Sequence, residues 1–370
     1  MKYENQVYDA WLAAAELPCE WLIPLLYETK GSREAYEAFA AGDASVREMI
    51  PPQSFKALSG FAREQAMEGF REASLRHGIK SMTILDAEYP HCLRDIPDPP
   101  GILFYQGNPE CLTAEKRVAM VGSRTASYAG LKASRKIARE LSRGGVTVIS
   151  GLAYGIDAEC HRGCLEGGSP TAAVMGCGLD NSYPAENSGL KQEIIDHGGI
   201  IISEYAPGAK PIGRHFPYRN RIISGLGDVV ILMEAKIRSG SMTTIGHALK
   251  QGREVYAYPG DPTSLMTEAN RTLLREGARY FTEAEDILND MDWLDKSKPI
   301  RQNIGCSAPE VPENAHEKAV VSALARGALG FDELIQATRL DPSELMGTLT
   351  MLQIKKLIEI LPGKKYQLRT

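Results

Sequence analysis

A run of positive and aromatic side chains near the middle of the chain is the segment best suited to bind an anion. The 23 residues Tyr205–Gly227 include no Asp or Glu but four cations. In single-strand binding proteins, cations contact the phosphate backbone and aromatic rings stack on the bases. A small nucleotide satisfies few cations, so this segment favours a longer anion. The alternative is a solvated loop that buries Phe216. The candidate binding residues are Lys210, Arg214, Phe216, Arg219, Asn220 and Arg221.

Gly122-Ser123-Arg124 follows an apolar run and precedes a helix that we expect to begin near Ala129 or Gly130. A helix N-terminus offers free N–H groups and a partial positive charge. The planar guanidinium of an arginine matches the geometry of a phosphate. This segment is therefore a candidate phosphate site. A tight turn with an exposed Arg124 would explain the same residues.

Two later segments share this pattern of glycine and hydroxyl residues after an apolar run. Ser150-Gly151 opens one of them, and Asp157 is predicted to cap the helix that follows. Ser239-Gly240-Ser241 opens the other and is predicted to form an anion-binding helix start, supported by nearby Lys236 and Arg238. A simple helix cap is the alternative for this last segment. Glycine lets the backbone approach a ligand closely in both.

A parallel β-sheet would position these segments. Short runs of apolar residues separated by helix-length segments are typical of buried parallel strands joined by right-handed crossovers. Ligands bind outside the carboxyl ends of such strands, which is where the glycine segments fall. Two further strands, at Lys80–Ile84 and Ile102–Tyr105, are expected at one edge. The six apolar runs are Val118–Val121, Val146–Ile149, Ala172–Met175, Ile200–Ile202, Val229–Met233 and Val255–Tyr258.

Domains are expected on both sides of the sheet. Residues 1–75 show helical spacing of apolar residues and predict a small all-helical domain, with the sheet domain in residues 76–290. Residues 291–314 are polar and contain several prolines, as linkers do. Residues 315–370 predict three helices and a hairpin, the order of a winged helix. The third helix, expected at Asp341–Leu352, has no Arg or Lys, which disfavours reading of a DNA major groove.

Composition limits the class of protein. The formal charge is −5, so any nucleic-acid site must be local. No apolar run reaches the length of about 18 residues that a membrane span needs, and the N-terminus lacks a secretory pattern. Seven scattered cysteines without a CxxC pair indicate free thiols in a reducing compartment. We therefore expect a cytoplasmic protein without a membrane contact or a metal site.

Known catalytic and cofactor patterns are absent from the sequence. It contains neither GxGxxG nor GxxxxGK[ST], which disfavours NAD, FAD and a P-loop NTPase. Glu204 and Glu234 follow two predicted strands that we expect to be neighbours, and they could form a carboxylate pair. No nucleophile and base accompany them in a recognisable pattern. No cofactor and no catalytic set are predicted.

The chain contains an ordered series of short motifs. They are Val121–Arg124, Ser150–Asp157 with His161, Gly176–Asp180, Tyr183–Asn187, Ser203–Tyr205, Phe216–Leu226, Glu234-Ala235, Ser239–Ser241, Gly252–Val255 and Pro259-Gly260. The series continues on the N-terminal side into Tyr89-Pro90 and Asp98-Pro99-Pro100. Taken together, these motifs resemble those of one family, the DNA-processing protein A family, also called DprA or Smf.

The resemblance implies an α/β fold with an extended Rossmann-like, mostly parallel sheet, a helical SAM-like N-terminal domain and a C-terminal winged helix. It implies a non-catalytic homodimer that binds and protects incoming single-stranded DNA and loads the recombinase RecA during natural transformation. Phe216 would lie near a stacked base. By the family's motifs, the residues of the DNA pocket would include Gly122, Ser123, Arg124, Ser150, Gly151, Arg219, Arg221, Ser239, Gly240 and Ser241.

Two positions depart from the family's pattern. Ala185 stands where many members carry a basic residue after Tyr-Pro, so one phosphate contact would be missing. Ala269 stands where the resemblance leads us to expect a glycine, and Arg271 is a candidate to compensate with its charge.

Two other functions remain open at this point. Phosphoribohydrolases with a related Rossmann-like fold cleave bases from nucleotides, and their glycine signature is followed by a catalytic Glu. The corresponding residues Ser239–His247 include no Glu, which disfavours this activity. A transcription regulator would instead bind duplex DNA through residues 315–370 and use the sheet domain as a nucleotide sensor.

Overall fold

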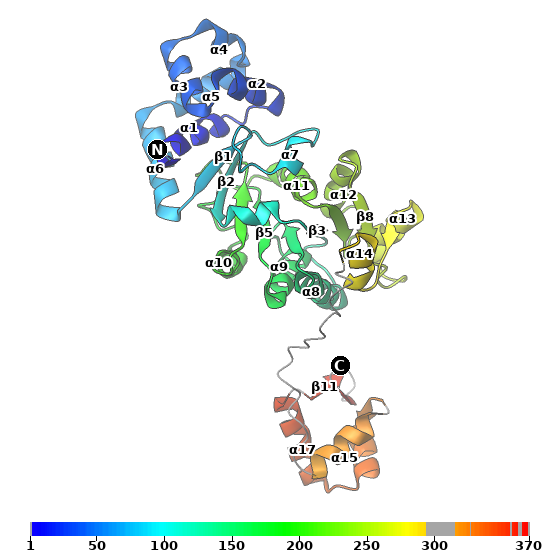
Figure 1. Cartoon of the computed structure of the whole chain (residues 1–370). Coiled ribbons are helices and arrows are strands. Elements are labelled where there is room, and N and C mark those ends of the chain that lie inside the picture. The colour runs from blue at the N-terminus through cyan, green and yellow to red at the C-terminus, as the bar shows by residue number, and fades with distance from the viewer. Residues whose placement is uncertain (1, 294–314, 326, 356, 362–364, 369–370) are drawn as a thin grey trace. The chain divides into compact units, whose positions relative to one another are not determined.

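The computed structural model describes residues 2–293, 315–325, 327–355, 357–361 and 365–368. The chain divides into two compact units, Met1–Leu294 and Asp295–Thr370 (Figure 1). Of the predicted linker at 291–314, only the first three residues are among those described. Cys306 also lies outside the described residues.

Helices form the N-terminal part of the first unit, as predicted. The indole of Trp11 is fully buried, and its Nε1 donates a hydrogen bond to the carbonyl of Leu58 at 3.0 Å. Tyr36 and Phe39 pack edge-on against the same indole. The core of these helices continues into that of the sheet, where Gly101 lies against Leu22. The helices are α1 (Lys2–Ala14), α2 (Cys19–Thr29), α3 (Ser32–Ala41), α4 (Ala44–Glu48), α5 (Pro52–Phe61) and α6 (Glu64–His77).

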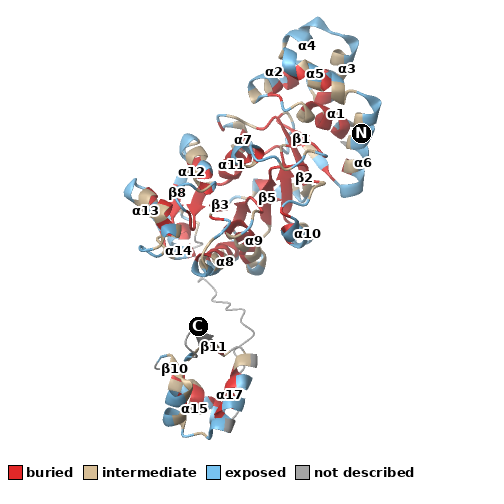
Figure 2. Cartoon of the chain, turned by 180° about the vertical axis from the view of Figure 1, so that it is seen from behind, coloured by how far each residue is buried: buried red, intermediate tan, exposed pale blue. Residues whose placement is uncertain are grey.

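A nine-stranded sheet forms the centre of this unit, and Figure 2 shows its central strands as buried. The six strands predicted from apolar runs all form, within two residues of the expected bounds. The two predicted edge strands, β1 and β2, also form and pair antiparallel. The strands are β1 (Lys80–Thr83), β2 (Ile102–Gly107), β3 (Arg117–Val121), β4 (Thr147–Ser150), β5 (Thr171–Met175), β6 (Ile200–Ser203), β7 (Val229–Leu232), β8 (Glu254–Ala257) and β9 (Arg279–Tyr280).

Strand order determines where a ligand site can form. The order is β1-β2-β6-β5-β4-β3-β7-β8-β9, and every pair from β6 to β9 is parallel. The chain proceeds from β3 outward to β6, then returns to place β7 on the other side of β3. In open α/β sheets, ligands bind beyond the carboxyl ends of the strands at such a reversal. The end of β3 is therefore the expected binding position.

Helices cover both faces of the sheet, because side chains alternate along its strands. Val118 and Met120 of β3 pack with α8, α9 and α14, whereas Ala119 and Val121 face α11 and α12. The helices of this region are α7 (His91–Arg94), α8 (Tyr128–Arg143), α9 (Ile156–Gly167), α10 (Ser188–Asp196), α11 (His215–Leu226), α12 (Ser241–Lys250), α13 (Glu268–Arg275) and α14 (Ala284–Asp290), with 3₁₀ turns at Pro109–Thr113, Ala185–Asn187 and Leu265–Thr267.

The second unit has the three helices and hairpin expected of a winged helix, with a third short strand. Its sheet order is β10-β12-β11, and Leu334, Leu345 and Leu349 are in its core. No described helix in either unit is long and apolar enough to cross a membrane. The elements are α15 (Ala315–Leu324), β10 (Leu329–Gly330), α16 (Phe331–Thr338), α17 (Pro342–Ile354), β11 (Ile358–Leu361) and β12 (Lys365–Leu368).

Asn270 joins the ends of β7 and β8, and its removal should destabilise the fold. Its fully buried amide nitrogen donates to the carbonyls of Leu232, Met233 and Tyr258 at 2.9–3.1 Å, and its oxygen accepts from the amide of Ala235. Asn270→Ala removes these four buried hydrogen bonds, so the free energy of unfolding in urea should fall by about 2–4 kcal/mol. The exposed Asn289→Ala should change it little, and equal losses in the two variants would contradict this account.

Candidate nucleic-acid interface

A groove of about 510 Å³ opens at the carboxyl end of β3, where the strand order reverses. Gly151 lines a smaller pocket that adjoins this groove and shares Arg124, Phe216 and Arg219 with it. The structure thus brings together most of the residues selected from the sequence. Those that line the groove are Gly122, Ser123, Arg124, Phe216, Arg219, Asn220, Ser239, Gly240 and Ser241.

The basic segment proves to be mainly the helix α11 rather than a loop, and its periodicity divides the predicted residues. Phe216, Arg219 and Asn220 have helical spacing and share the face that lines the groove. Arg221 follows Arg219 by two positions and therefore points to the opposite side. There its guanidinium bonds Glu204 at 2.6 Å and lies 3.9 Å from the ring centre of Tyr218. The prediction that Arg221 lines the pocket is wrong.

Three more predicted residues lie outside both pockets. The hydroxyl of Ser150 is buried and donates to the carbonyl of Met120 at 2.7 Å, so it stabilises the sheet. Arg214 forms an ion pair with Glu16 at 3.1 Å. Lys210 is exposed and is not among the lining residues. Lys236 and Arg238 do line the groove. The sequence identifies these two cations only as support for the helix start at Ser239-Gly240-Ser241.

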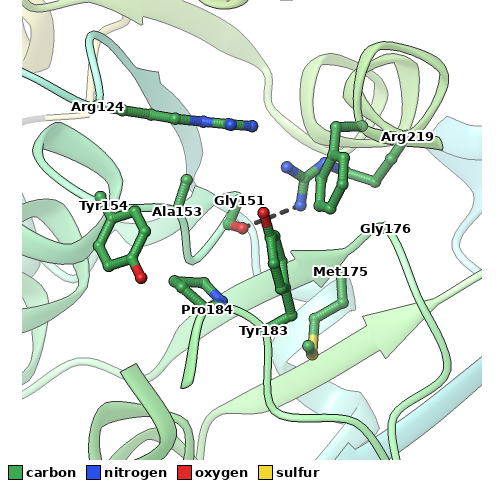
Figure 3. Close-up of a pocket in the computed structure, with 10 residues that line it drawn as sticks. Arg124, Gly151, Ala153, Tyr154, Met175, Gly176, Tyr183, Pro184 and Arg219 are labelled. Carbon is green, nitrogen blue, oxygen red and sulfur yellow. Dashed lines mark hydrogen bonds between the residues drawn. The ribbon is translucent and has the colours of Figure 1, made fainter. Parts of the chain in front are cut away.

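Arg219 forms the floor of the site. Only 3% of the residue is exposed, and its Nη1 donates to the carbonyl of Gly151 (Figure 3) and to that of Val174. Burial lowers the pKa of this guanidinium to about 10, opposed by the nearby charge of Asp157. A Cβ on residue 151 would lie 2.7 Å from both Arg219 Nη2 and Asp157 Oδ2, so this position requires glycine. The buried cation is thus held by backbone carbonyls and by the amide oxygen of Asn220 beneath the groove.

Asp157 supports this floor, although not in the predicted manner. Helix α9 begins at Ile156, so Asp157 lies in its first turn and Gly155 occupies the N-cap position. The carboxylate of Asp157 instead accepts from the amides of Gly151 and Ala153 at 3.2 and 3.4 Å. Burial raises the pKa of Asp157, opposed by the charge of Arg219. The residue folds the loop after β4 around the guanidinium.

An aromatic pair with a cation above it forms one wall. The guanidinium carbon of Arg124 lies 5.5 Å from the ring centre of Phe216, and the ring of Tyr183 lies 5.2 Å from Phe216. Gly176 packs against the same phenyl ring, because a Cβ there would lie 3.0 Å from Phe216 Cδ1. Arg124 itself is exposed and pairs with no carboxylate among the residues that the structure describes, so it is available to an anionic ligand.

The two predicted helix starts differ. At α8, Glu234 already occupies the N-terminus: its carboxylate accepts from the amide and hydroxyl of Ser127 at 2.7 and 2.5 Å. The Gly122-Ser123-Arg124 segment would therefore bind an anion through its own backbone and side-chain groups, and not through the N-terminus of α8. At α12, Gly240 provides no side-chain cap, and the hydroxyls of Ser239 and Ser241 lie 2.8 Å apart at the groove.

The carboxylate pair considered from the sequence does not form. β6 and β7, the strands before Glu204 and Glu234, are separated by β5, β4 and β3 in the sheet. Glu204 bonds Arg221 and Glu234 bonds Ser127, so neither carboxylate is presented to the groove. Among the residues that the structure describes, no three His, Cys, Asp or Glu side chains gather in a way that could hold a metal ion.

Family models and relatives agree with these motifs. The model of DNA recombination-mediator protein A matches residues 80–292, and the model of the DprA winged helix domain matches residues 307–364. The chain belongs to the DprA/Smf family. Its α/β sheet and winged helix are therefore those of a family of DNA recombination mediators, as the resemblance implied.

Relatives and solved structures of the family support this assignment. The DNA processing protein DprA of Streptococcus pneumoniae is 43% identical over 213 residues, covering 58% of this chain and 74% of that protein. The Smf protein of a Synechocystis species is 31% identical over 330 residues, covering 81% and 83%. The crystal structure of DprA from Streptococcus pneumoniae matches 78% of this chain and 98% of its own, with a TM-score of 0.65 and 32% identity.

A DNA processing protein A from Helicobacter pylori, whose structure describes the single-stranded DNA binding mode of that protein, is also similar. It matches 58% of this chain and 95% of its own, with a TM-score of 0.52 and 28% identity.

The departures from the family's pattern have structural consequences here. Ala269 is fully buried, and Arg271 bonds the carbonyls of Asp261 and Ser264, so its charge serves the local loop. Ala185 is exposed beside Pro184, a residue of the smaller pocket.

His161, behind the floor of the pocket, gives the fold a pH dependence. Its Nδ1 lies 2.8 Å from Thr171 Oγ1, which itself donates to the carbonyl of Val148, so Nδ1 carries the proton. Burial, together with the charge of Arg219, lowers the pKa of His161 from 6.5 to about 3. Between these pH values the unfolded chain binds a proton that the native chain does not, so stability falls as pH falls.

Between pH 7 and pH 5, the titration of His161 should therefore lower the free energy of unfolding by about 2 kcal/mol. His161→Gln should flatten this part of the stability profile, measured by urea unfolding at several pH values. His197→Gln, which changes an exposed residue, is the matched control and should keep the parental slope. A parental slope in His161→Gln would show that this residue does not titrate as described.

Proposed function

We propose that this chain binds single-stranded DNA in the groove at the end of β3 and passes the strand to the recombinase RecA. It would do so as a cytoplasmic homodimer that protects incoming DNA during natural transformation, without chemical change to the DNA. The observation that carries the proposal is the combination of a buried cation, exposed cations and an aromatic wall in one groove. Membership in a family of recombination mediators supports the same role.

The charges in the groove match a phosphate chain. Arg124 and Arg219 lie at one part of it, and Lys236 and Arg238 at another, next to the uncapped start of α12. The lowered pKa of Arg219 means that its burial is incompletely compensated within the protein. A phosphate oxygen beside this guanidinium would supply the missing negative charge in a poorly solvated place, where charge-assisted hydrogen bonds are strong.

The aromatic wall favours a single strand over a duplex. A base can stack on Phe216 only when it is free of its partner and of its neighbours in a helix, as in single-strand binding proteins. Stacking tolerates any base, so binding should depend little on sequence. The winged helix does not supply an obvious duplex reader, because α17 carries no Arg or Lys. We propose a protein-contact role for this unit.

Transfer to RecA and dimerisation are the parts of the proposal that concern protein partners. A mediator must hold the strand loosely enough to release it, which fits a groove whose cations are mostly exposed rather than deeply enclosed. Stimulation of RecA filament formation on single-stranded DNA, together with the mass of the protein in solution by light scattering, tests this part. No stimulation by a protein that binds the strand would contradict the transfer role.

Arg124→Ala should weaken binding of a labelled poly-dT strand about tenfold, because it removes one charge-assisted phosphate contact. The slope of log affinity against log salt should become shallower by about 0.7, as one fewer counterion is released. Both are measured by fluorescence anisotropy at several salt concentrations. Arg124 is exposed, so the variant should keep the parental melting temperature.

Arg143→Ala is the matched control, because it removes an exposed arginine at the opposite end of α8 from the groove. It should bind like the parent. Equal weakening in the two variants would mean that general charge, rather than the groove, drives the interaction.

Removal of residues 295–370 separates this proposal from a transcription regulator that binds DNA through its winged helix. The remaining residues form a compact unit that contains the whole groove. The truncated chain should therefore retain most of its affinity for single-stranded DNA, within about threefold by anisotropy. Loss of all DNA binding after truncation would instead place the DNA site in the winged helix.

A further inference from the structure

Two exposed tyrosines line the smaller pocket beside the groove. Tyr154, from the loop after β4, and Tyr183, from the loop after β5, are each 42% exposed. Figure 3 shows their rings on opposite sides of the pocket, with Ala153 and Pro184 between them and Arg124 above. Large aromatic rings are normally buried or bonded to a partner surface, so two half-exposed rings around one pocket indicate a ligand with a flat apolar face.

The protein holds the first ring in place. The hydroxyl of Tyr154 donates to the carboxylate of Glu186, which fixes the polar end of the side chain. Its loop is constrained as well, because Leu152 and Gly155 adopt φ of 54° and 73°. A non-glycine residue in the left-handed region costs free energy and is concentrated at functional sites. The ring is therefore presented with a defined orientation.

The second ring belongs to the aromatic wall of the main groove. Tyr183 contacts Phe216 at 5.2 Å between ring centres, with the planes tilted by 39°. A strand that places one base near Phe216 can therefore bring the adjacent base to the other side of Tyr183. The two pockets share Tyr183, Arg124 and Arg219, so the path between them is continuous.

Charge determines which part of a nucleotide can lie against each tyrosine. Arg124 and Arg219 provide positive charge at this pocket, whereas the hydroxyl of Tyr154 is bonded to the carboxylate of Glu186. A phosphate would be attracted to the arginines and repelled by the carboxylate. The uncharged base is the part of the chain that suits the side of Tyr154.

We propose that one unpaired nucleobase of a bound strand occupies the mouth of this small pocket, of about 20 Å³, and stacks on the exposed rings of Tyr154 and Tyr183, while the adjacent phosphate contacts Arg124 and Arg219. This inference rests on the proposed single-stranded DNA binding and adds a base-binding subsite to it. Base stacking on aromatic side chains does not require a particular base, so the subsite adds affinity without sequence preference.

The test compares two strands of equal length in the full-length protein. One is poly-dT, and in the other every nucleoside is replaced by an abasic tetrahydrofuran, which keeps the phosphates and removes the bases. Tyr154→Ala and Tyr183→Ala should each weaken binding of poly-dT by about fivefold or more and leave binding of the abasic strand unchanged. Arg124→Ala should weaken binding of both strands, because it removes a phosphate contact.

Two further variants control for effects on the fold. Tyr154→Phe keeps the ring and loses only the bond to Glu186, so it should bind poly-dT nearly as the parent does. Tyr27→Ala removes a tyrosine that is 58% exposed on α2, outside both pockets, and should bind both strands like the parent.

Each other result overturns a distinct part of the account. If Tyr154→Ala binds poly-dT as Tyr27→Ala does, no base occupies the pocket. If it weakens both strands equally, the tyrosine supports the loop and does not contact a base. If the parent binds neither strand, the proposed function itself fails and the subsite with it.

Discussion

The site depends on a positive charge held out of water at the edge of the sheet. Arg219 is almost fully buried, yet its hydrogen bonds go to neutral groups, two main-chain carbonyls and the amide oxygen of Asn220, and the closest negative charge, Asp157, is itself buried. Burying a charge is costly unless it is compensated. The loop after β4 therefore has to bend tightly around the guanidinium, with glycine at 151 and Asp157 bonded to its amides. An anionic ligand would complete this compensation.

The sheet places this charge where a polymer can reach it. Because β7 returns to the side of β3, loops from both halves of the sheet meet at one groove. The aromatic wall of Phe216 and Tyr183 stands beside the cations, so phosphates and bases can be bound at the same time. The carboxylates of Glu204 and Glu234 are used for internal contacts, which leaves the groove positive although the chain as a whole is negative.

Much of the fold could be predicted from the sequence, because six strands of the central sheet are apolar runs ending in small or polar residues. Strand order could not be predicted, since the sequence predicts β6 and β7 as neighbours, whereas three strands separate them. Residue types alone could not separate Arg219 from Arg221, since both are cations of one basic segment. Only the helical phase of α11 places one in the groove and the other against Glu204. The hydrogen bonds of Glu234 with Ser127 at the N-terminus of α8 likewise join residues 107 positions apart, so no local pattern reveals them.

The most direct test of the central claim is the anisotropy of a labelled poly-dT strand against a matched duplex, at two salt concentrations, with the full-length protein. A groove of cations and stacking rings predicts that the single strand binds more tightly than the duplex and that its affinity falls steeply as salt rises. Preference for the duplex, or binding of the single strand that is unaffected by salt, would contradict the account.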